Sequence, residues 1–516
     1  MIENTMEQEV ILGGWLRSPV VIIEAGPGCG KSTTCGMMAS SLPSSEQPKV
    51  LGTAFNRDIV YALAKKLPSR CDVRTLNGIG HMAWETHRDA KSSLNAKKTR
   101  EMLKHIQDDG RWSISPEEFE ILINLVNMAK AQGYLPPATG SAYKSLISFH
   151  DLCLVSEIRA EPHYEKLLNE TLSRSIKAAY KGDIDFEDQC YVSTFFASGT
   201  SFPSPEYLFV DEAQDLSPLQ LLMVKRIKAK HRIFVGDPKQ AIYAFRGAMS
   251  DSFEKIREMF PEHVVYPLLR SFRLPSKVVS YLQSYNPRLT PGKQDQGTLE
   301  VLSGTFTMLQ MHEATWDKSR AILCRNNAPL YRVALACIAS RVRFQISNPN
   351  FGKGLISDIR RVIRNLASVP ADELPDLMAR HWFKEDMDGK EFDAMCDKVA
   401  TLACLANYSP TAETVVKMLS TLLTTQNLSD KSKPFVLATG HKAKGLEFDW
   451  VMHLDPGLIP AKFATKADEV IQEHNIAYVI NSRTLHTLLF ANSEQILIPG
   501  ATQIRHRPKI GKDIPL

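Results

Sequence analysis

The sequence lacks the features of a secreted, membrane-spanning or zinc-binding protein. Its nine cysteines are scattered without a CxxC pair, and its 14 histidines form neither an HExxH motif nor a cluster with cysteines. This pattern argues against a zinc site and against a disulfide framework, and it is typical of a reducing compartment. The first ten residues, MIENTMEQEV, are too acidic and polar for a signal peptide, and no run of 18 apolar residues is present. We therefore expect a protein that is neither secreted nor embedded in a membrane.

The charge is nearly balanced, so composition alone says little about partners. Among 516 residues, 62 are Lys or Arg and 57 are Asp or Glu, which gives a net charge of +5. This mild excess favours a nucleic-acid partner only weakly. Three basic runs stand out: KRIKAKHR (225–232), IRRVIR (359–364) and RHRPKIGK (505–512). Each is compatible with a solvated face and with a patch that follows phosphates.

Short apolar runs rich in β-branched residues recur along the chain and predict buried parallel strands. They lie at 20–23, 49–55, 207–210, 232–235, 321–324, 435–439 and 450–454. Helical patterns separate them, for example at 58–67 and 218–229. Strands that alternate with helices predict an α/β fold with parallel sheets.

The predicted strands fall into two groups, and the chain is long enough for two to four domains. Residues 85–185 and 355–431 are rich in helical patterns and almost free of strand patterns. We therefore predict two α/β cores, each interrupted by a helical insertion. The predicted parts are core one (1–84 and 186–270), insertion one (85–185), core two (271–354 and 432–500), a shorter insertion two (355–431) and a basic tail (501–516).

In the stretch VVIIEAGPGCGKSTT (20–34), a predicted strand is followed by a Gly-rich turn and then by a predicted helix. This order argues against a Gly-rich turn that occurs by chance. Its AGPGCGKS segment matches the Walker A pattern, with Ala25 in place of the first glycine. Small residues let backbone N–H groups surround a β-phosphate, Lys31 brings a charge to the β- and γ-phosphates, and the Ser32 hydroxyl can ligate Mg²⁺. The predicted binding residues of this loop are Ala25, Gly26, Pro27, Gly28, Cys29, Gly30, Lys31, Ser32 and Thr33.

The stretch YLFVDEAQDLSPLQ (207–220) ends an apolar strand on two adjacent carboxylates. Neighbouring carboxylates repel each other when buried, so a cation is expected beside them. We expect strand 207–210 to lie next to strand 20–23. Asp211 would then hold Mg²⁺ through water, and Glu212 would polarise the water that attacks the nucleotide. An acidic N-cap for the following helix is an alternative for Asp215, but it explains the pair 211–212 poorly.

The DEAQD segment, which follows a strand far downstream of the phosphate loop, resembles superfamily 1 helicases of the UvrD/Rep/PcrA type. The resemblance covers nearly the whole chain in order and looks closest to the compact group that includes the F-box DNA helicases. MEQEVI (6–11) resembles the adenine-reading glutamine motif, with Gln8 as the reader. GTAFNRDIVYAL (52–63) resembles motif Ia and implies that Phe55 and Asn56 contact single-stranded DNA. RTLNGIGH (74–81) resembles motif Ib, with Asn77 where the family usually carries His.

VGDPKQAIYAFRGA (235–248) resembles motif III of the same family. The resemblance implies that Gln240 senses the γ-phosphate, that Tyr243 and Phe245 stack on bases, and that Arg246 meets the DNA backbone. Stacking contributes roughly 1–3 kcal/mol per base and is indifferent to base identity. The alternative is that both aromatic side chains belong to the core. Their i, i+2 spacing after a turn favours a shared exposed face.

Motifs IV, V and VI have counterparts in the second half of the chain. LLRSFRLP (268–275) resembles motif IV, which implies that Phe272 stacks on adenine and that Arg273 meets the γ-phosphate. LATGHKAKGLEFDWV (437–451) resembles motif V, with His441 and Lys444 at the DNA and Glu447 at the ribose. QEHNIAYVINSRTLHTLLF (472–490) resembles motif VI, with Arg483 as a γ-phosphate finger.

One acidic segment resembles a part of the family that is not one of its numbered motifs. DIDFEDQCY (183–191) resembles the stretch before motif II, and its acids are expected to make structural contacts or to form a solvated face.

The resemblance implies two RecA-like cores with ATP and Mg²⁺ between them. It further implies a motor that travels 3′ to 5′ on single-stranded DNA and separates tailed duplexes. The alternative is an ATP-gated DNA-binding or assembly module that recruits a nuclease or a replication or repair partner and unwinds little. Either would reside in the cytoplasm of a bacterial or phage-infected cell, or in a nucleus.

Overall fold

The computed structural model describes residues 4–43, 49–54, 56–137, 139–156, 158–243, 247–249, 251–383, 387, 389–424 and 432–499. The chain divides into two compact units, Met1–Leu269 and Arg270–Leu516. Each unit is built on a six-stranded sheet, and all strand pairs in both sheets are parallel. The predicted α/β class is therefore confirmed. Within the described ranges, no helix has the length and apolar character needed to cross a lipid bilayer.

The first sheet has the strand order β3-β2-β6-β7-β1-β8. Its strands are β1 (Val20–Ala25), β2 (Val50–Ala54), β3 (Asp72–Thr75), β6 (Tyr207–Val210), β7 (His231–Gly236) and β8 (His263–Leu268). The prediction that strand 207–210 lies next to strand 20–23 is wrong, because β7 lies between β6 and β1 and pairs with both. Since all strands are parallel, their carboxyl ends still meet at one edge of the sheet.

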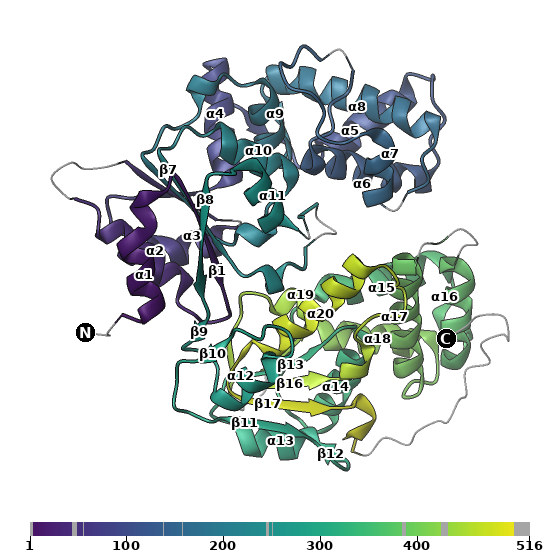
Figure 1. Ribbon diagram of the computed structural model, residues 1–516. Coiled ribbons are helices and arrows are strands. Elements are labelled where there is room, and N and C mark those ends of the chain that lie inside the picture. Colours follow the sequence, from purple (N-terminus) through teal and green to yellow (C-terminus); the bar gives the residue numbers. More distant parts are fainter. Residues whose placement is uncertain are drawn as a thin grey trace. The chain divides into compact units, whose positions relative to one another are not determined.

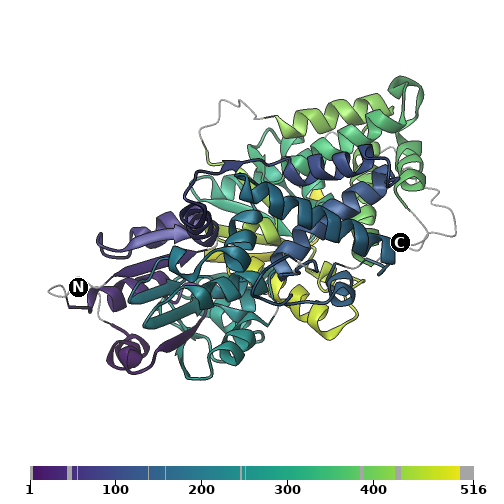
Figure 2. The same ribbon diagram turned by 90° about the horizontal axis from the view of Figure 1, so that it is seen from above.

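The helices of the first unit fall into two groups, one around the sheet and one in the predicted insertion. The first group is α1 (Met6–Gly14), α2 (Lys31–Ser40), α3 (Arg57–Ala64), α4 (Leu76–Arg88), α9 (Asp188–Phe196), α10 (Pro218–Arg226) and α11 (Ser252–Met259). The second is α5 (Lys98–Asp108), α6 (Pro116–Gln132), α7 (Phe149–Val155) and α8 (Pro162–Tyr180), flanked by the short paired strands β4 (Ser93–Leu94) and β5 (Asp183–Ile184). The purple N-terminal elements and the blue insertion helices occupy separate regions of the unit in both views (Figures 1 and 2).

One hydrophobic core nevertheless serves both groups of helices. It runs from Ile22 and Val210 in the sheet to Leu103 and Leu168 in the insertion. Apolar surface on the insertion is therefore buried against the same interior as the sheet. The insertion and the sheet form a single folded body.

The second unit repeats this plan with the strand order β11-β17-β16-β13-β15-β14. Its strands are β11 (Thr298–Val301), β13 (Arg320–Cys324), β14 (Phe344–Ile346), β15 (Phe435–Thr439), β16 (Phe448–Leu454) and β17 (Thr484–Ala491). The helices are α12 (Ser276–Leu282), α13 (Met308–Thr315), α14 (Ala328–Ala339), α15 (Pro349–Val362), α16 (Leu374–Trp382), α17 (Gly389–Ala406), α18 (Ala412–Leu423), α19 (Gly440–Ala443) and α20 (Ala467–Asn481). A single core again joins the sheet, for example Leu437, to the insertion helices, for example Leu402 and Leu419.

All seven strands predicted from apolar runs are present within one or two residues of their predicted bounds. The subdomain boundaries stay a prediction, because the two units are not divided further. The proposed tail, residues 501–516, lies outside the described residues.

Candidate nucleotide and nucleic-acid sites

The phosphate loop lies between the carboxyl end of β1 and the start of α2. Gly28 and Gly30 have φ angles of 68° and 84°, a left-handed conformation that side-chain-bearing residues rarely adopt. Gly30 is the N-cap of α2, and it has no side chain that could bond to the first turn of that helix. The N-terminal N–H groups of α2 and its dipole therefore suit an anion such as a phosphate. This geometry fits the predicted role of residues 25–33, among which Thr33 is exposed.

The acidic pair approaches this loop although its strand is not adjacent. The Ser32 hydroxyl donates a hydrogen bond to Asp211 Oδ2 at 3.2 Å. Lys31 Nζ lies 3.4 Å from Glu212 Oε1. Glu212 has a φ of 52°, so the chain turns sharply after β6 and directs its carboxylate to the lysine. The four predicted residues thus form one constellation at the edge of the sheet.

The electrostatics of this constellation favour a bound cation. Burial, together with the Glu212 carboxylate, raises the pKa of Asp211 from 3.8 to about 6. A buried carboxylate that is expensive to ionise is stabilised when a metal ion lies beside it. A hydroxyl and a carboxylate in contact are hard oxygen ligands of the kind that Mg²⁺ prefers. The residues present therefore fit a magnesium–nucleotide complex.

A third strand end extends the site. After β7, Gln240 Nε2 donates to Asp237 Oδ2 at 2.7 Å, and the Asp237 N–H donates to Gln214 Oε1 at 3.1 Å. Gln214 in turn donates to Glu212 through its amide nitrogen. Burial raises the pKa of Asp237. The chain Gln240–Asp237–Gln214–Glu212 links the predicted γ-phosphate sensor to the predicted polariser of water.

Asp237 and Gln214 lie inside the VGDPKQ and DEAQD segments, yet sequence reasoning gave them no role. Their polar character after a strand was the available signal. The helix that follows is capped by Ser217, whose hydroxyl accepts from the Gln220 N–H, so Asp215 is not its N-cap.

Gln8 joins α1 to the phosphate-binding helix. Its Nε2 donates to Thr34 Oγ1 at 3.2 Å, and its Oε1 accepts from the Thr5 N–H at 3.0 Å as part of a capping box. The side chain is 5% exposed. In this arrangement Gln8 fixes α1 against α2, and its predicted reading of adenine stays a prediction.

A groove in the first unit contains two of the predicted DNA contacts, Asn56 and Tyr243. Its volume is about 780 Å³, and Asn56, Asn77, Phe186, Asp215 and Tyr243 are among the residues that line it. Asn56 is also the N-cap of α3. Phe55, Phe245 and Arg246, which were predicted to contact DNA, lie outside the described residues.

Phe186 was missed as a groove residue, although the DIDFEDQCY stretch that contains it was singled out for its acids. Its side chain is 58% exposed. An exposed aromatic ring on a groove wall is a candidate for stacking on a base. The signal in the sequence was a phenylalanine between acidic residues, where a core residue is rarely found.

Two short segments connect the nucleotide constellation to the groove. Residues 211–217 begin at Asp211 and end at Ser217 in the groove wall. Residues 237–243 begin at Asp237 and end at Tyr243, also in the groove wall. Each segment therefore has one end at each site.

The second unit holds the remaining predicted nucleotide residues. Arg273 forms an ion pair with Glu447, so the predicted γ-phosphate contact and the predicted ribose contact are partners in this structure. Phe272 is 39% exposed, and the Arg270 guanidinium lies 5.8 Å from its ring centroid. His441, within α19, and Lys444, which caps that helix, are both partly exposed.

Arg483 is 2% exposed and is held by its own helix end. Its Nε donates to the Val479 carbonyl at 2.9 Å, and Nη2 donates to Ser482 Oγ at 2.8 Å. Its predicted role as a γ-phosphate finger stays a prediction.

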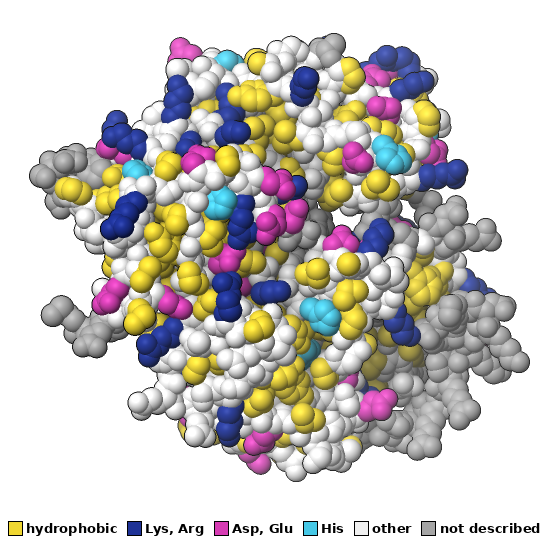
Figure 3. Space-filling model, viewed as in Figure 1, with side chains coloured by type: hydrophobic (Ala, Val, Ile, Leu, Met, Phe, Trp, Pro, Cys, Tyr) yellow, Lys and Arg dark blue, Asp and Glu magenta, His cyan; other side chains and the backbone are white. Residues whose placement is uncertain are grey.

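The basic runs are partly structural. In run 225–232, Arg226 donates to the carbonyls of Ser193 and Ala197, and Arg232 donates to the Ile227 carbonyl at 2.6 Å. Figure 3 shows Lys and Arg side chains spread over one face among acidic and apolar ones. This distribution supports the solvated-face interpretation for that face, whereas run 505–512 lies outside the described residues.

Comparisons with known proteins agree with the site geometry. Residues 5–261 match the UvrD/REP helicase N-terminal domain, and residues 355–495 match the UvrD-like helicase C-terminal domain. The chain is 25% identical to F-box DNA helicase 1 of Gallus gallus over 318 residues, which cover 56% of this chain and 29% of that protein. It is 25% identical to F-box DNA helicase protein 1 of Schizosaccharomyces pombe over 302 residues, 54% of this chain and 32% of that protein.

A bacterial relative is more distant. The chain is 23% identical to ATP-dependent DNA helicase Rep of Buchnera aphidicola over 215 residues, which cover 35% of this chain and 32% of that protein. The matched regions span about a third of the length of these three relatives. With the two domain matches in order along a phosphate-loop fold, the chain belongs to the UvrD-like helicases of superfamily 1.

Proposed function

We propose that the protein is an ATP-dependent DNA helicase or translocase that moves on single-stranded DNA from 3′ to 5′. The observation that carries the proposal is the convergence of Lys31, Ser32, Asp211 and Glu212 at one sheet edge. Its family membership and the names of its relatives support the same activity.

In this proposal the phosphate loop binds the triphosphate of ATP, with Lys31 at the β- and γ-phosphates. Ser32 and Asp211 would hold Mg²⁺, which would supply positive charge against that of the triphosphate. Glu212 orients the attacking water and accepts its proton. The hydrogen-bond chain from Gln240 through Asp237 to Gln214 ends on the Glu212 carboxylate and keeps it in place.

The second unit contributes the positive charges that hydrolysis needs. We assign Arg273 and Arg483 to the γ-phosphate, Glu447 to the ribose and Phe272 to adenine. An arginine that stabilises the transition state contributes roughly 10³–10⁵ in rate. Arg273 is paired with Glu447, so we expect nucleotide binding to change the contacts of both residues.

Single-stranded DNA, including the tail of a partly duplex molecule, is the proposed polymer substrate. Tyr243 and Phe186 offer aromatic faces in the groove, where Asn56 offers a polar contact. We also assign DNA contacts to His441 and Lys444 of the second unit. Stacking does not read sequence, as a motor on arbitrary DNA requires. All nine cysteines are free thiols, and we place the protein in a reducing compartment such as cytoplasm or nucleus.

A second candidate function is an ATP-gated DNA-binding module that recruits a nuclease or a replication or repair partner. The ion pair between Arg273 and Glu447 favours it, because that pair can hold the protein in a resting state until nucleotide arrives. Strand displacement separates the two candidates.

The decisive experiment measures ATP turnover with and without single-stranded DNA, and then unwinding of duplexes with 3′ or 5′ tails. A helicase raises turnover at least tenfold with DNA and unwinds the 3′-tailed duplex, whereas the Lys31→Ala variant does neither. DNA-dependent ATP binding without strand displacement would select the second candidate. Preference for the 5′ tail would overturn the proposed direction.

A further inference from the structure

The turn that carries Phe186 is closed by its own acids. The Asp188 N–H donates to Asp185 Oδ1 at 2.8 Å, and the Asp185 N–H donates to Asp188 Oδ2 at 3.0 Å. The turn lies between β5, which ends at Ile184, and α9, which begins at Asp188. Both carboxylates are therefore committed to the shape of a four-residue segment, 185–188.

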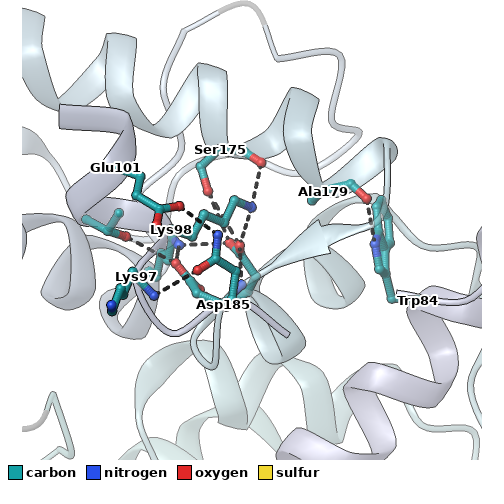
Figure 4. A network of polar contacts seen from close by, with 11 residues as sticks. Trp84, Lys97, Lys98, Glu101, Ser175, Ala179 and Asp185 are labelled. Atoms are coloured by element: carbon teal, nitrogen blue, oxygen red, sulfur yellow. Dashed lines mark hydrogen bonds and ion pairs between the residues drawn. The ribbon is translucent and has the colours of Figure 1, made fainter. Parts of the chain in front are cut away.

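Two buried lysines of the insertion form ion pairs with these acids. Lys98 Nζ lies 2.5 Å from Asp188 Oδ2, and Lys130 Nζ lies 2.5 Å from Asp185 Oδ2 and 2.8 Å from Asp188 Oδ1. Lys98, Lys130 and Asp188 are 0% exposed, and Asp185 is 5% exposed. Figure 4 shows Lys98 reaching both Ser175 and the acidic turn, with the Ser175 carbonyl 2.9 Å from Nζ.

Stability alone is a weak reason for this arrangement. Taking four charges out of water is costly, and apolar residues of similar volume often stabilise a core as well or better. Burial by itself would raise the pKa of Asp188, but Lys130 and Lys98 lower it below its usual value, so the carboxylate stays charged. What a buried, fully bonded network supplies is a fixed geometry.

The other side of the turn is held by a residue of α4, outside the insertion. Asn77 Nδ2, on α4, donates to the Phe186 carbonyl at 2.8 Å. The 185–188 turn is thus clamped from the insertion by Lys98 and Lys130 and from the core by Asn77. Between the clamps, the Phe186 ring extends 58% exposed into the groove.

We propose that Lys98, Lys130, Asp185, Asp188 and Asn77 are positioning residues for DNA binding, which together fix the turn that presents Phe186 to a base of the single strand. This inference rests on the proposed function of the groove. The bonds of this network run between the insertion, the turn and α4, so we expect it to act on the affinity for DNA and to leave the ATP chemistry unchanged.

The test uses the full chain and an oligonucleotide containing 2-aminopurine, whose fluorescence reports stacking. Three single variants, Phe186→Ala, Asn77→Ala and Lys130→Met, are compared with the Asn77→Ala/Phe186→Ala double variant. We expect Phe186→Ala to weaken DNA binding about 5- to 150-fold, the range that loss of one stacked base predicts. Asn77→Ala and Lys130→Met should each weaken it about 3- to 10-fold and reduce the stacking signal. The DNA concentration for half-maximal ATP turnover should rise equally, with kcat at saturating DNA unchanged.

Matched controls separate positioning from loss of stability. Gln107→Ala removes a hydrogen bond to the Ile114 carbonyl at the far end of α5, the helix that begins with Lys98. Leu125→Ala removes a buried side chain from α6, the helix that carries Lys130. Neither control should change DNA affinity more than twofold. Since Asn77 is partly exposed and uncharged, its variant carries the test even where Lys130→Met does not fold.

The outcomes are distinct. If Asn77→Ala weakens binding in the wild-type background but not further in the Phe186→Ala background, the two residues act through one contact and the inference holds. If Phe186→Ala weakens binding while Asn77→Ala and Lys130→Met behave like their controls, the inference is overturned and the proposed function stands. A wild-type protein that neither binds the oligonucleotide nor responds to it in ATP turnover refutes the proposed function and the inference together.

Discussion

Glu212 occupies a left-handed backbone conformation, with a φ of 52°, at the point where β6 ends. Such a conformation costs free energy for a residue with a side chain, and strained residues of this kind cluster at functional sites. Here the strain directs one carboxylate to Lys31 while the preceding one meets Ser32. Local geometry thus explains how two adjacent acids reach two different partners.

Changing Glu212 to Gln should separate ATP binding from hydrolysis. The amide keeps the shape of the side chain but cannot accept a proton from water, so single-turnover hydrolysis should fall about 10²- to 10⁴-fold. Nucleotide affinity, measured by equilibrium binding, should change less than threefold. Glu9→Gln, on the exposed face of α1, is the control. Hydrolysis within tenfold of wild type in Glu212→Gln would contradict the role of Glu212 as the base.

We expect Asp211 to make the metal-free protein less stable at neutral pH. The folded protein holds its proton up to about pH 6, whereas the unfolded chain releases it near pH 3.8. Stability is therefore lost as the pH rises through this window, and the loss amounts to about 3 kcal/mol at most.

The Asp211→Asn variant has an amide in place of the carboxyl group, so this position no longer titrates. In the presence of a chelator it should be about 1–3 kcal/mol more stable than wild type at pH 8, and the difference should shrink towards pH 4. Denaturant unfolding at several pH values measures this. Equal stabilities across the range would show that burial of Asp211 carries no cost.

At the scale of elements, the insertion of the second unit is fixed by a helix cap. Asp397 of α17 accepts hydrogen bonds from the N–H groups of Asn327 and Ala328 at 2.9 and 2.8 Å, at the start of α14. The side chain is 8% exposed, and burial raises its pKa. A carboxylate from one helix thus satisfies the N-terminus of another.

Asp397→Ala should lower the free energy of unfolding by about 2–3 kcal/mol, because it removes the cap and leaves buried N–H groups unsatisfied. Asp397→Asn, which retains one acceptor, should cost less than half of that. Urea denaturation checks both, with the exposed Glu373→Ala as the control. A loss below 0.5 kcal/mol in Asp397→Ala, within the ordinary range of surface substitutions, would contradict the capping role.

The elements show which structural features a sequence can predict. Buried central strands such as β1 and β6 are continuous apolar runs, so local pattern identified them. The edge strand β8 was missed because it is mostly half-exposed and contains Pro267. The position of β7 between β1 and β6 was also missed, because apolar content does not encode which strand is the neighbour.

The candidate site divides in the same way. Lys31, Ser32, Asp211 and Glu212 follow strand ends in recognisable segments, and the structure brings them together. The clamp of Asn77 on Phe186 joins residues far apart in sequence, and no local pattern carries such a contact.

At the scale of the whole molecule, each unit shares one core with its insertion. In the second unit, Leu330 and Val333 of α14 pack in the same cluster as Leu355, Leu402 and Leu419 of the insertion helices. Removing the insertion would therefore expose a large apolar surface to water.

Replacing residues 350–424 by a short Gly/Ser linker should give protein that aggregates or unfolds without a cooperative transition. Calorimetry and soluble yield measure this. A linker of the same length placed after Gly304, where a Cβ would meet no atom within 4 Å, should be tolerated. A soluble, cooperatively unfolding deletion would show that the insertion is a separable domain.

Residues 211–217 and 237–243 each connect the nucleotide constellation to the groove. In each segment the end at the nucleotide constellation and the end in the groove wall are only six residues apart in the sequence. A displacement can therefore pass along the backbone itself. For the proposed function we therefore expect that a shift of either segment at its phosphate end also moves the groove wall at Ser217 and Tyr243, and that a shift of this wall moves the Glu212 end in turn.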